Sequence, residues 1–519
     1  MTWRDVRCGQ LTGAHAGGAV TLAGWVRDLR DDGATVTIEL RDGTGVATLV
    51  VDRRERAELA TMAASVTRES VVQACGRVAV EGEPTVRLES LRVLSAAGPL
   101  PFRPDDPAVP HDDFGPDSPR LRQRWLHLRS EHAQRVLRLR SRIASEIRRA
   151  MEDQDFLEVE TPLLHKPMPV GGNDFLVASR VTPGELFGLP QSPQFYKELL
   201  GIGGVDRYYQ IARAFRDEPV GQHRIHELTQ FDLEMAFATR DDVFGVVETA
   251  LARVWRRCLG VDLTVPFRRV TWREARERYG TDRPDLRYGL EIAEAPEHGA
   301  WGVVAERPLP AGEAGLEAVA RAPGVTAMGL AASDTSGALQ VTDPDLAGAA
   351  ARLLGGRLAA TAVIARGEPA AVAETLGRAR TWLAGRLGLA AGGPCFAWVV
   401  DFPLFVWSEE WRCFVCEHNP FTAPTPETAH LLDSDPGAAV GQSYDLVCDG
   451  IELGGGALRI ESAAEQAKVF DVMGLSEDDR RFWLAPYLDA LETGAPPRGG
   501  IAVGLDRLLM LALGAADIR

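Results

Sequence analysis

Long apolar runs are missing from this sequence, and cysteines are few. No stretch approaches the roughly 20 apolar residues that a membrane-spanning helix needs, and Met1 to Asp5 do not resemble the start of a signal peptide. We therefore expect a cytoplasmic protein that does not associate with membranes. The 7 cysteines are an odd and scattered set, which argues against a disulfide framework. Cys413 and Cys416 form a CxxC without a second pair, so we interpret them as ordinary strand residues rather than zinc ligands.

Basic residues are not in surplus either. The net charge is −16, whereas binding to nucleic-acid phosphates requires clustered Lys and Arg. One arginine-rich segment runs from Arg120 to Arg142, and it is compatible with an RNA-facing surface or with the solvated face of a helix. The chain has 519 residues, enough for about three domains, because single cores stop growing at about 250–300 residues.

The N-terminal part predicts a small barrel. Alternating apolar residues between turn signals predict five strands with one helix between the third and the fourth. The strands are predicted at 20–26, 35–40, 46–51, 71–80 and 85–93, and the helix at 55–64. This is the order of an OB-fold, which often binds oligonucleotides. We expect the barrel to occupy residues 1–105 and a Pro- and Asp-rich linker to follow at 106–131.

The remainder predicts an antiparallel sheet with flanking helices, so the fold class is α+β. Helical apolar spacing covers 132–154, and a strand at 156–162 ends at a proline. Further strands are expected at 186–189, 207–214 and 228–236, and a helix is expected at 193–200. Between 288 and 395 the composition changes to Ala, Gly and Val without a chemical motif, which indicates an inserted α/β domain.

Two motifs that pair an arginine with acids lie far apart in the chain. Phe215-Arg216-Asp217-Glu218 is central, and Gly504-Leu505-Asp506-Arg507 is close to the end. Arg216 and Glu218 stand two apart on a predicted strand, so both side chains point to one face. An arginine there can bind a phosphate and a carboxylate in a bidentate manner, and Arg507 near a helix start can meet an anion. A surface ion pair is the simpler alternative for either motif alone.

Two further polar clusters strengthen the interpretation. Gln230, Asp232 and Glu234 alternate along the next predicted strand, and buried polar groups in such a row need partners. Glu452 precedes three glycines and Arg459. Glycines let the backbone approach a ligand closely, and Arg459 can pair with a side-chain carboxylate. A plain glycine-rich turn is the alternative for the second cluster.

Taken together, the motifs resemble those of bacterial aspartyl-tRNA synthetases, which are class II enzymes. QSPQ, FRDE, TQFDLE, HNPFT, ELGGGALRI and GLDR stand in that family's order and approximate spacing, at 191–194, 215–218, 229–234, 418–422, 452–460 and 504–507. The resemblance implies an anticodon-binding barrel, a catalytic domain in two parts and an inserted GAD-like domain. These parts would span 1–105, 132–287 with 396–519, and 288–395. A homodimer built through 156–162 is also implied.

The resemblance implies a reaction in two steps that uses ATP and Mg²⁺. L-Aspartate attacks the α-phosphate of ATP to give aspartyl-adenylate, and the aspartyl group then passes to the 3′ end of tRNA(Asp). Arg216 and Arg507 are the implied catalytic residues, Glu452 is the implied magnesium ligand, and Arg30 is the implied tRNA contact. The implied ATP-binding residues are Arg216, Asp217, Glu218, Leu228, Glu452, Gly504, Leu505, Asp506 and Arg507. The implied aspartate-binding residues are Ser192, Gln194, Lys197, Arg216, Gln230, Asp232, His418 and Arg459.

Four positions depart from the family's pattern. Val170 replaces a glutamate in the loop over the amino acid, Ile225 and Leu228 replace a glutamine and a phenylalanine around ATP, and Thr37 replaces a phenylalanine of the barrel. Stacking of a base on an aromatic ring is worth about 1–3 kcal/mol, so we expect weaker contacts to ATP and tRNA. Two hypotheses stay open: a synthetase that charges tRNA(Asp), and a divergent relative that passes activated aspartate to a non-tRNA acceptor in biosynthesis or self-resistance.

Overall fold

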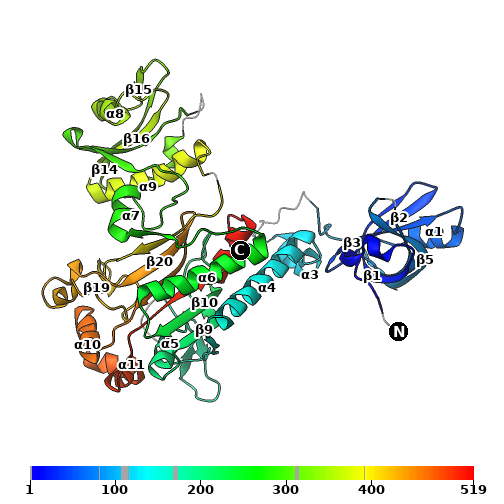
Figure 1. Cartoon of the computed structure of the whole chain (residues 1–519), viewed down its shortest axis with the longest axis horizontal. Coiled ribbons are helices and arrows are strands. Elements are labelled where there is room, and N and C mark those ends of the chain that lie inside the picture. The colour runs from blue at the N-terminus through cyan, green and yellow to red at the C-terminus, as the bar shows by residue number, and fades with distance from the viewer. Residues whose placement is uncertain are drawn as a thin grey trace. The chain divides into compact units, whose positions relative to one another are not determined.

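The computed structural model describes residues 3–80, 82–106, 115, 117–167, 173–309, 315–390 and 392–519. The chain divides into two compact units, Met1–Arg140 with Arg519, and Ser141–Ile518. Among the described residues, no helix is both long and apolar enough to cross a membrane. Figure 1 shows the elements in chain order.

The first unit contains the predicted barrel. Its strands are β1 (Ala19–Asp31), β2 (Thr35–Asp42), β3 (Gly45–Asp52), β4 (Val71–Val80) and β5 (Pro84–Ser95), and α1 (Ala57–Ala64) lies between β3 and β4. They close in the order β1-β2-β3-β5-β4, which confirms the predicted OB-fold. Alternate residues point inward because side chains alternate across a strand, and Leu22, Val36 and Leu40 are among the buried core residues.

Helices lead from the barrel towards the second unit. Two short helices, α2 (Pro119–Arg122) and α3 (Arg124–His127), precede the long helix α4 (Glu131–Glu152). Residues 107–114 and 116 of the predicted linker lie outside the described residues. The predicted helix at 132–154 corresponds to α4, whose buried positions include Ile143, Ile147 and Met151.

A large mixed sheet forms the centre of the second unit. Its order is β11-β17-β20-β21-β22-β10-β9-β6, and its inner neighbours from β17 to β9 are antiparallel, as predicted. The strands are β6 (Leu157–Glu158), β9 (Arg207–Phe215), β10 (Glu227–Ala236), β11 (Arg268–Thr271), β17 (Phe396–Val400), β20 (Ser443–Cys448), β21 (Ile451–Leu458) and β22 (Arg498–Gly504).

The edge strand β6 is shorter than predicted. A strand was expected over 156–162, but only Leu157–Glu158 pair with β9 as a strand. The Val159 N–H still donates to the Tyr209 carbonyl at 3.1 Å, and the pairing stops before Pro162. Proline has no N–H to donate, so the ladder cannot continue through it.

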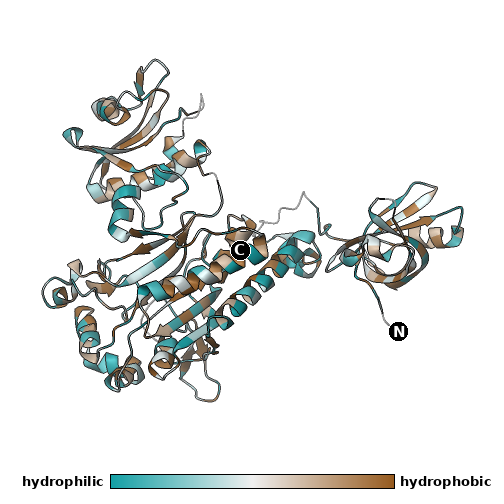
Figure 2. Ribbon diagram, in the orientation of Figure 1, coloured by the Kyte–Doolittle hydropathy of each residue, from teal (hydrophilic) through white to brown (hydrophobic). Residues whose placement is uncertain are grey.

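Helices cover the sheet and frame its ends. They are α5 (Gln194–Ile202), α6 (Arg240–Leu259), α7 (Trp272–Tyr279), α10 (Ala463–Val472), α11 (Glu477–Glu492) and α12 (Leu505–Leu513). Thr239 and Asp242 form a capping box that starts α6, and Gly260 ends it in the left-handed region. Figure 2 shows hydrophobic and hydrophilic stretches along α6, and its buried Phe244 stacks on Trp398 of β17 at 3.9 Å. Burial of this apolar face holds α6 on the sheet.

Two short hairpins extend from the second unit. They pair β7 (Leu176–Ala178) with β8 (Leu186–Gly188), and β18 (Phe405–Ser408) with β19 (Cys413–Cys416). Cys413 and Cys416 are free thiols in β19, which confirms their interpretation as strand residues. Single 3-10 turns lie at Cys8–Gln10, Gly13–His15, Pro296–His298, Leu316–Ala318, Pro344–Leu346, Ala429–Asp433 and Pro436–Ala438.

In the sequence, a second sheet lies between the two groups of strands that form the large sheet. Its strands are β12 (Ile292–Ala295), β13 (Ala300–Ala305), β14 (Val325–Ser333), β15 (Leu339–Val341) and β16 (Thr361–Gly367), in the order β12-β13-β16-β14-β15. Helices α8 (Ala347–Leu354) and α9 (Pro369–Arg386) complete it. Buried Arg380 of α9 donates to the carbonyls of Asp285, Tyr288 and Leu290, which ties α9 to the segment that enters this sheet.

Candidate active site

The large sheet brings the two distant arginine motifs together. Strand β10 lies between β9 and β22, with Gln230 opposite Gly504 and Glu234 opposite Gly500. Arg216 directly follows β9, and Arg507 lies in the first turn of α12, which follows β22. β21, with Glu452, is the next neighbour of β22. The candidate residues of four strands therefore share one end of the sheet.

Arg216 and Glu218 are not on a strand, contrary to the sequence prediction. β9 ends at Phe215, and the ladder continues for one bond, from the Arg216 N–H to the His226 carbonyl at 2.8 Å. The chain then turns through the loop of residues 217–226, where Pro219 has no N–H to pair. Alternation along a strand consequently does not set the direction of these two side chains.

Four arginines gather at this end of the sheet, and we call them the arginine cluster: Arg216, Arg224, Arg283 and Arg507. Burial lowers the pKa of Arg507; Glu452 opposes this effect, while the other three arginines lower that pKa further. The Nε of Arg216 is buried without a hydrogen-bond partner. Guanidinium groups that repel each other while one donor stays free favour an anion with several charges.

Backbone carbonyls and carboxylates hold the cluster in place. Arg507 donates through Nη1 to the Glu452 carbonyl at 2.5 Å and through Nη2 to the His223 carbonyl at 3.2 Å. The Glu452 carboxylate lies 3.2 Å from Arg283 and 3.7 Å from Arg507. Glu218 lies 3.6 Å from Arg224. Arg224, Arg283 and Arg507 therefore each contact a group on a loop or at the end of a strand.

The other members of the two motifs have distinct positions. Asp506 accepts from the Thr229 N–H at 2.8 Å, so this carboxylate fastens α12 to β10. Gly504 is the N-cap of α12, Leu505 is buried, and Asp217 is exposed. Leu228 is half-buried on β10 opposite Ala214.

Six buried charged side chains form a second group, the buried ion cluster: Lys197, Glu198, Asp232, Glu234, Arg459 and Arg498. None of the six is more than 2% exposed. Lys197 lies 2.9 Å from Asp232 and 3.3 Å from Glu234. Arg459 donates to both oxygens of Glu234, at 3.0 and 3.1 Å. The predicted row on β10 is therefore buried, and Asp232 and Glu234 in it have charged partners.

A glycine makes room for this cluster. A Cβ at Gly500 would lie 2.2 Å from a Glu234 carboxylate oxygen and 2.1 Å from the Leu233 carbonyl. Any side chain there would displace Glu234 from Arg459. The glycine-rich start of β22 is thus a packing requirement of the buried charges.

Several polar atoms of the cluster are buried without a hydrogen bond. They are Nη1 of Arg459, both carboxylate oxygens of Asp232 and Oε1 of Gln230. Burial raises the pKa of Asp232 to about 6, although Lys197 opposes this effect. Since buried polar groups normally have partners, free donors and acceptors side by side indicate a place for a ligand with both charges.

Helix α5 supplies the remaining predicted contacts. Ser192 Oγ accepts from the Gln194 N–H at 3.1 Å, and the Gln194 side-chain amide donates to Glu198. Lys197 lies on the same helix and is 1% exposed. The structure brings Gln194, Lys197, Asp232 and Arg459 together around one cluster, and Gln230 stands on the same face of β10 as Asp232.

His418 has a partner that the sequence interpretation missed. Its Nε2 lies 2.9 Å from Asp445 Oδ1 on β20, and its ring meets Phe402 edge-on at 4.6 Å. Burial alone would lower the pKa of His418, but Asp445, with Glu417 and Glu452, raises it overall. Burial also raises the pKa of Asp445, and Glu452 raises it further. A lone acid within the apolar run from Tyr444 to Val447 was the available sequence signal.

Asp445 and Glu452 are compatible with a magnesium ion. They lie on adjacent strands, and each raises the energy of the other's charge. Mg²⁺ is usually held by one or two carboxylates together with substrate phosphates. Within the described ranges no three His, Cys, Asp or Glu side chains gather as a metal site. Two carboxylates beside the arginine cluster fit an ion that arrives with phosphates.

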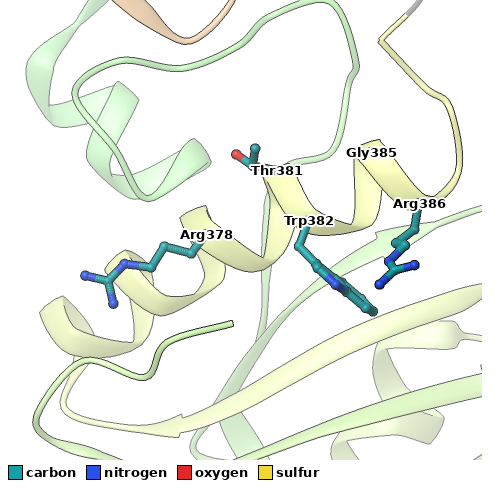
Figure 3. Close-up of a pocket in the computed structure, with 5 residues that line it drawn as sticks. All are labelled: Arg378, Thr381, Trp382, Gly385 and Arg386. Carbon is teal, nitrogen blue, oxygen red and sulfur yellow. The ribbon is translucent and has the colours of Figure 1, made fainter. Parts of the chain in front are cut away.

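Three further regions bear on the sequence predictions or on the search for a site. Arg30 of β1 is exposed and lies 3.8 Å from Asp28 and 3.9 Å from Glu39, and Thr37 pairs with it across the barrel strands. Residues 168–172, which include Val170, lie outside the described residues. Figure 3 shows a pocket on α9 lined by Arg378, Thr381, Trp382, Gly385 and Arg386, none of which is a predicted site residue.

Comparison with known families shows the group to which the chain belongs. Residues 117–519 match the model of the class II tRNA synthetases (D, K and N), and residues 20–94 match that of the OB-fold nucleic acid binding domain. The chain belongs to the class II tRNA synthetases of this group. The predicted resemblance is thereby confirmed at the level of the family.

Named relatives of this class II synthetase span nearly its whole length. An aspartate–tRNA(Asp/Asn) ligase of Moorella thermoacetica is 40% identical, covering 99% of this chain and 91% of the relative. One of Salinispora arenicola is 39% identical, over 98% and 89%. An aspartate–tRNA ligase of Geobacillus kaustophilus is 37% identical, over 99% and 93%.

Solved structures share the fold of the synthetase. Asparaginyl-tRNA synthetase of Pyrococcus horikoshii with asparaginyl-adenylate has a TM-score of 0.64 at 20% identity, covering 99% of this chain and 96% of that one. Aspartyl-tRNA synthetase of Entamoeba histolytica has a TM-score of 0.59 at 18% identity, over 98% and 88%. At these identities the likeness concerns the fold alone.

Proposed function

We propose that this chain is an aspartate–tRNA ligase, which activates L-aspartate with ATP and transfers the aspartyl group to the 3′ end of tRNA(Asp). The observation that carries the proposal is the buried ion cluster with its free Arg459 Nη1. The names of the full-length relatives support aspartate and tRNA as substrates. No observation favours transfer to a non-tRNA acceptor.

The side-chain carboxylate of aspartate binds in the buried ion cluster. Arg459 donates from Nη1, and Lys197 adds a second positive charge at close range. Asparagine carries an uncharged amide instead, so the free Arg459 donor would gain no charge-assisted hydrogen bond from it, and the amide N–H groups would face two cations. Asp232 Oδ2 and Gln230 Oε1, which accept no hydrogen bond, suit the substrate ammonium. Ser192, Gln194 and His418 border this pocket.

ATP binds at the arginine cluster. Arg216 holds the α-phosphate and the substrate α-carboxylate and so brings the attacking oxygen to phosphorus, and Arg507 holds the γ-phosphate. Both offset the negative charge that builds in the transition state. Glu218 contacts adenine, and the half-buried Leu228 lies beside the base. Asp217, Gly504, Leu505 and Asp506 form the backbone around these contacts.

Glu452 and Asp445 would hold a magnesium ion at the ATP site. The ion supplies charge neutralisation on the phosphates. The same two carboxylates orient the neighbouring groups, since Glu452 pairs with Arg283 and Asp445 pairs with His418. The sequence interpretation named Glu452 alone for this ion.

The remaining assignments follow from this function. The barrel at 1–105 binds the anticodon, with Arg30 as a contact. The linker occupies 106–131. The catalytic domain occupies 132–287 and 396–519, and the GAD-like insertion occupies 288–395. Exposed apolar side chains support a homodimer, and they include Leu157, Leu163, Leu164, Leu176 and Phe187. tRNA charging is consistent with a cytoplasmic location.

Aspartate-dependent exchange between ATP and pyrophosphate tests the first step. The full chain with Mg²⁺ should exchange label with L-aspartate and not with L-asparagine, and it should then charge a tRNA(Asp) transcript. Charging that depends on the anticodon supports the role of the barrel. If no amino acid supports exchange, the proposal is overturned. If aspartate supports exchange but neither tRNA(Asp) nor tRNA(Asn) is charged, its second step is overturned.

A further inference from the structure

Glu198 and Arg498 belong to the buried ion cluster but have no role in the proposed reaction. Glu198 lies on α5 and Arg498 begins β22. Glu198 Oε2 accepts from Arg498 Nε at 2.7 Å, and Glu198 Oε1 lies 3.0 Å from Arg459 Nε. Their exposed fractions are 0% and 1%. A fully buried ion pair therefore touches the arginine that binds the substrate.

Burying the Glu198–Arg498 ion pair costs free energy, and a role in orienting Arg459 accounts for that cost. Burial raises the pKa of Glu198, and Arg459 and Arg498 oppose that shift while Glu234 adds to it. Buried ion pairs rarely stabilise a fold more than well-packed apolar side chains would. The direction of Arg459 gives the pair a function that apolar side chains could not provide.

Two carboxylates determine how Arg459 lies. Glu234 accepts from Nε and Nη2, and Glu198 meets the same Nε from α5. The guanidinium group is planar, so contacts to its Nε edge fix the direction of the opposite edge. Nη1 is the donor that stays without a partner. Glu198 thus helps to aim the free donor at the ligand.

Arg498 is itself held by a buried chain of polar side chains. It donates to the Tyr487 hydroxyl at 3.3 Å, and that hydroxyl donates to Gln466 Oε1 at 3.2 Å. Gln466 Nε2 donates to the Pro420 carbonyl at 2.7 Å. Tyr487 and Gln466 are each 0% exposed. These hydrogen bonds connect Arg498 to Pro420, in the segment that carries His418.

Charge balance explains why Arg498 is needed. Lys197, Arg459 and Arg498 carry three positive charges, and Glu198, Asp232 and Glu234 carry three negative ones when ionised. Without Arg498, Arg459 would be the nearest cation left to Glu198, and Glu198 would then compete with the substrate carboxylate for it. Arg498 keeps Glu198 occupied while Glu198 still touches Arg459.

We propose that Glu198 and Arg498 are positioning residues, which hold the Arg459 guanidinium ready for the side-chain carboxylate of the substrate and so set the affinity for the amino acid. This inference rests on the proposed function. It separates the affinity for aspartate from the handling of ATP, because neither residue contacts the arginine cluster in any recorded hydrogen bond or ion pair among the described residues.

The test is the variant Glu198→Gln in the full chain, assayed by aspartate-dependent exchange. Glutamine has nearly the shape of glutamate, but one of its two terminal atoms is an amide nitrogen, which donates. The arginine that faces this nitrogen, Arg459 or Arg498, therefore loses its hydrogen-bond acceptor. We expect the KM for aspartate to rise about tenfold or more, since a hydrogen bond to a charged group is worth about 1.5–3 kcal/mol. The KM for ATP and kcat should stay within about threefold of wild type.

A matched control and a double variant exclude a general effect on folding. Glu248 of α6 is also buried and accepts from Phe267 N at 3.0 Å and Trp398 Nε1 at 2.9 Å. Glu248→Gln should lower the melting temperature without changing the KM for aspartate. Arg498→Gln should raise that KM, and Glu198→Gln with Arg498→Gln should recover most of the loss, because two amides can pair and the cluster stays neutral. If Glu198→Gln does not fold, Glu198→Asp replaces it, since a shorter carboxylate cannot reach both arginines.

The outcomes distinguish the inference from the proposed function. A folded Glu198 variant with an unchanged KM for aspartate, beside normal wild-type exchange, overturns the inference alone. KM values for aspartate and ATP that rise together would show a structural role and also overturn it. A wild-type protein without exchange would overturn the proposed function and this inference together.

Discussion

The buried ion cluster and the arginine cluster lie on the same sheet but are built in different ways. Five members of the first stand on strands or on α5, Arg459 directly follows β21, and none of the six is more than 2% exposed. In the second, Arg216 follows the end of β9, Arg224 and Arg283 lie on loops and Arg507 lies in the first turn of α12, and the side chain of Arg224 is 62% exposed. Sites on regular elements hold their geometry more precisely than sites on loops.

The difference concerns which partners a ligand must replace. In the buried ion cluster Arg459 Nη1 is already free, so a carboxylate adds a contact. In the arginine cluster Arg216 Nε is free, whereas Arg507 already donates to the His223 carbonyl of the loop. The buried ion cluster therefore offers its free donor on a guanidinium fixed by two carboxylates, while the arginine cluster contacts a loop.

Removal of Arg459 should break the buried cluster and have the largest effect. Arg459→Ala takes away the free donor and leaves Glu234 with Lys197 as its remaining contact cation. An uncompensated buried charge costs about 3–5 kcal/mol, so kcat/KM for aspartate in exchange should fall about a thousandfold. Arg256→Ala, which removes a pair with Asp262 that is 72% exposed at both side chains, should change little. A loss below tenfold in a folded Arg459 variant would contradict the assigned pocket.

Asp232 of the buried ion cluster should make the free energy of unfolding depend on pH. Burial raises the pKa of Asp232 from 3.8 to about 6. An acid with a raised pKa in the folded state contributes stability that is complete below its unfolded pKa of about 3.9 and is lost as the pH rises through the folded value. The contribution is roughly 3 kcal/mol. Urea unfolding of wild type and Asp232→Asn should diverge by this amount between about pH 4 and pH 7. Parallel curves would show that Asp232 does not titrate in this window.

Removal of Arg507 should affect ATP with little effect on the amino acid. Arg507→Ala withdraws one charge-assisted contact and some transition-state stabilisation, together worth about a hundredfold in kcat/KM for ATP. The KM for aspartate should stay within about threefold, because the buried ion cluster is intact. Exchange kinetics with each substrate varied in turn provide the measurement. Equal losses for both substrates would mean that the two clusters are not separate.

Regular elements were the part of the fold that could be predicted. The barrel strands and β10 alternate apolar and polar residues, and this pattern is local. The strand at 156–162 was too long in the prediction, because its pairing with β9 depends on a distant neighbour. The position of Arg216 was misjudged for a related reason: its motif continues the apolar run of β9, and only the hairpin register shows that the strand ends at Phe215.

The site divides in the same way. Gln230, Asp232 and Glu234 could be predicted as one face, and Lys197 and Arg459 through the resemblance to a family. Glu198 and Arg498 could not, since a charged residue on a helix normally faces solvent and their partnership spans 300 positions. Asp445 was overlooked because its partners, His418 and Glu452, come from other segments.

The sequence by itself determined the family, the alternating strands and the chemical types available for binding an acidic amino acid and a nucleotide. Tertiary structure decided which charges are buried together, which donor of Arg459 stays free and how Arg498 supports Glu198. The physical reason is that the energy of a charge depends on its surroundings in three dimensions, and these surroundings come from strands that are neighbours in the sheet but distant in the chain.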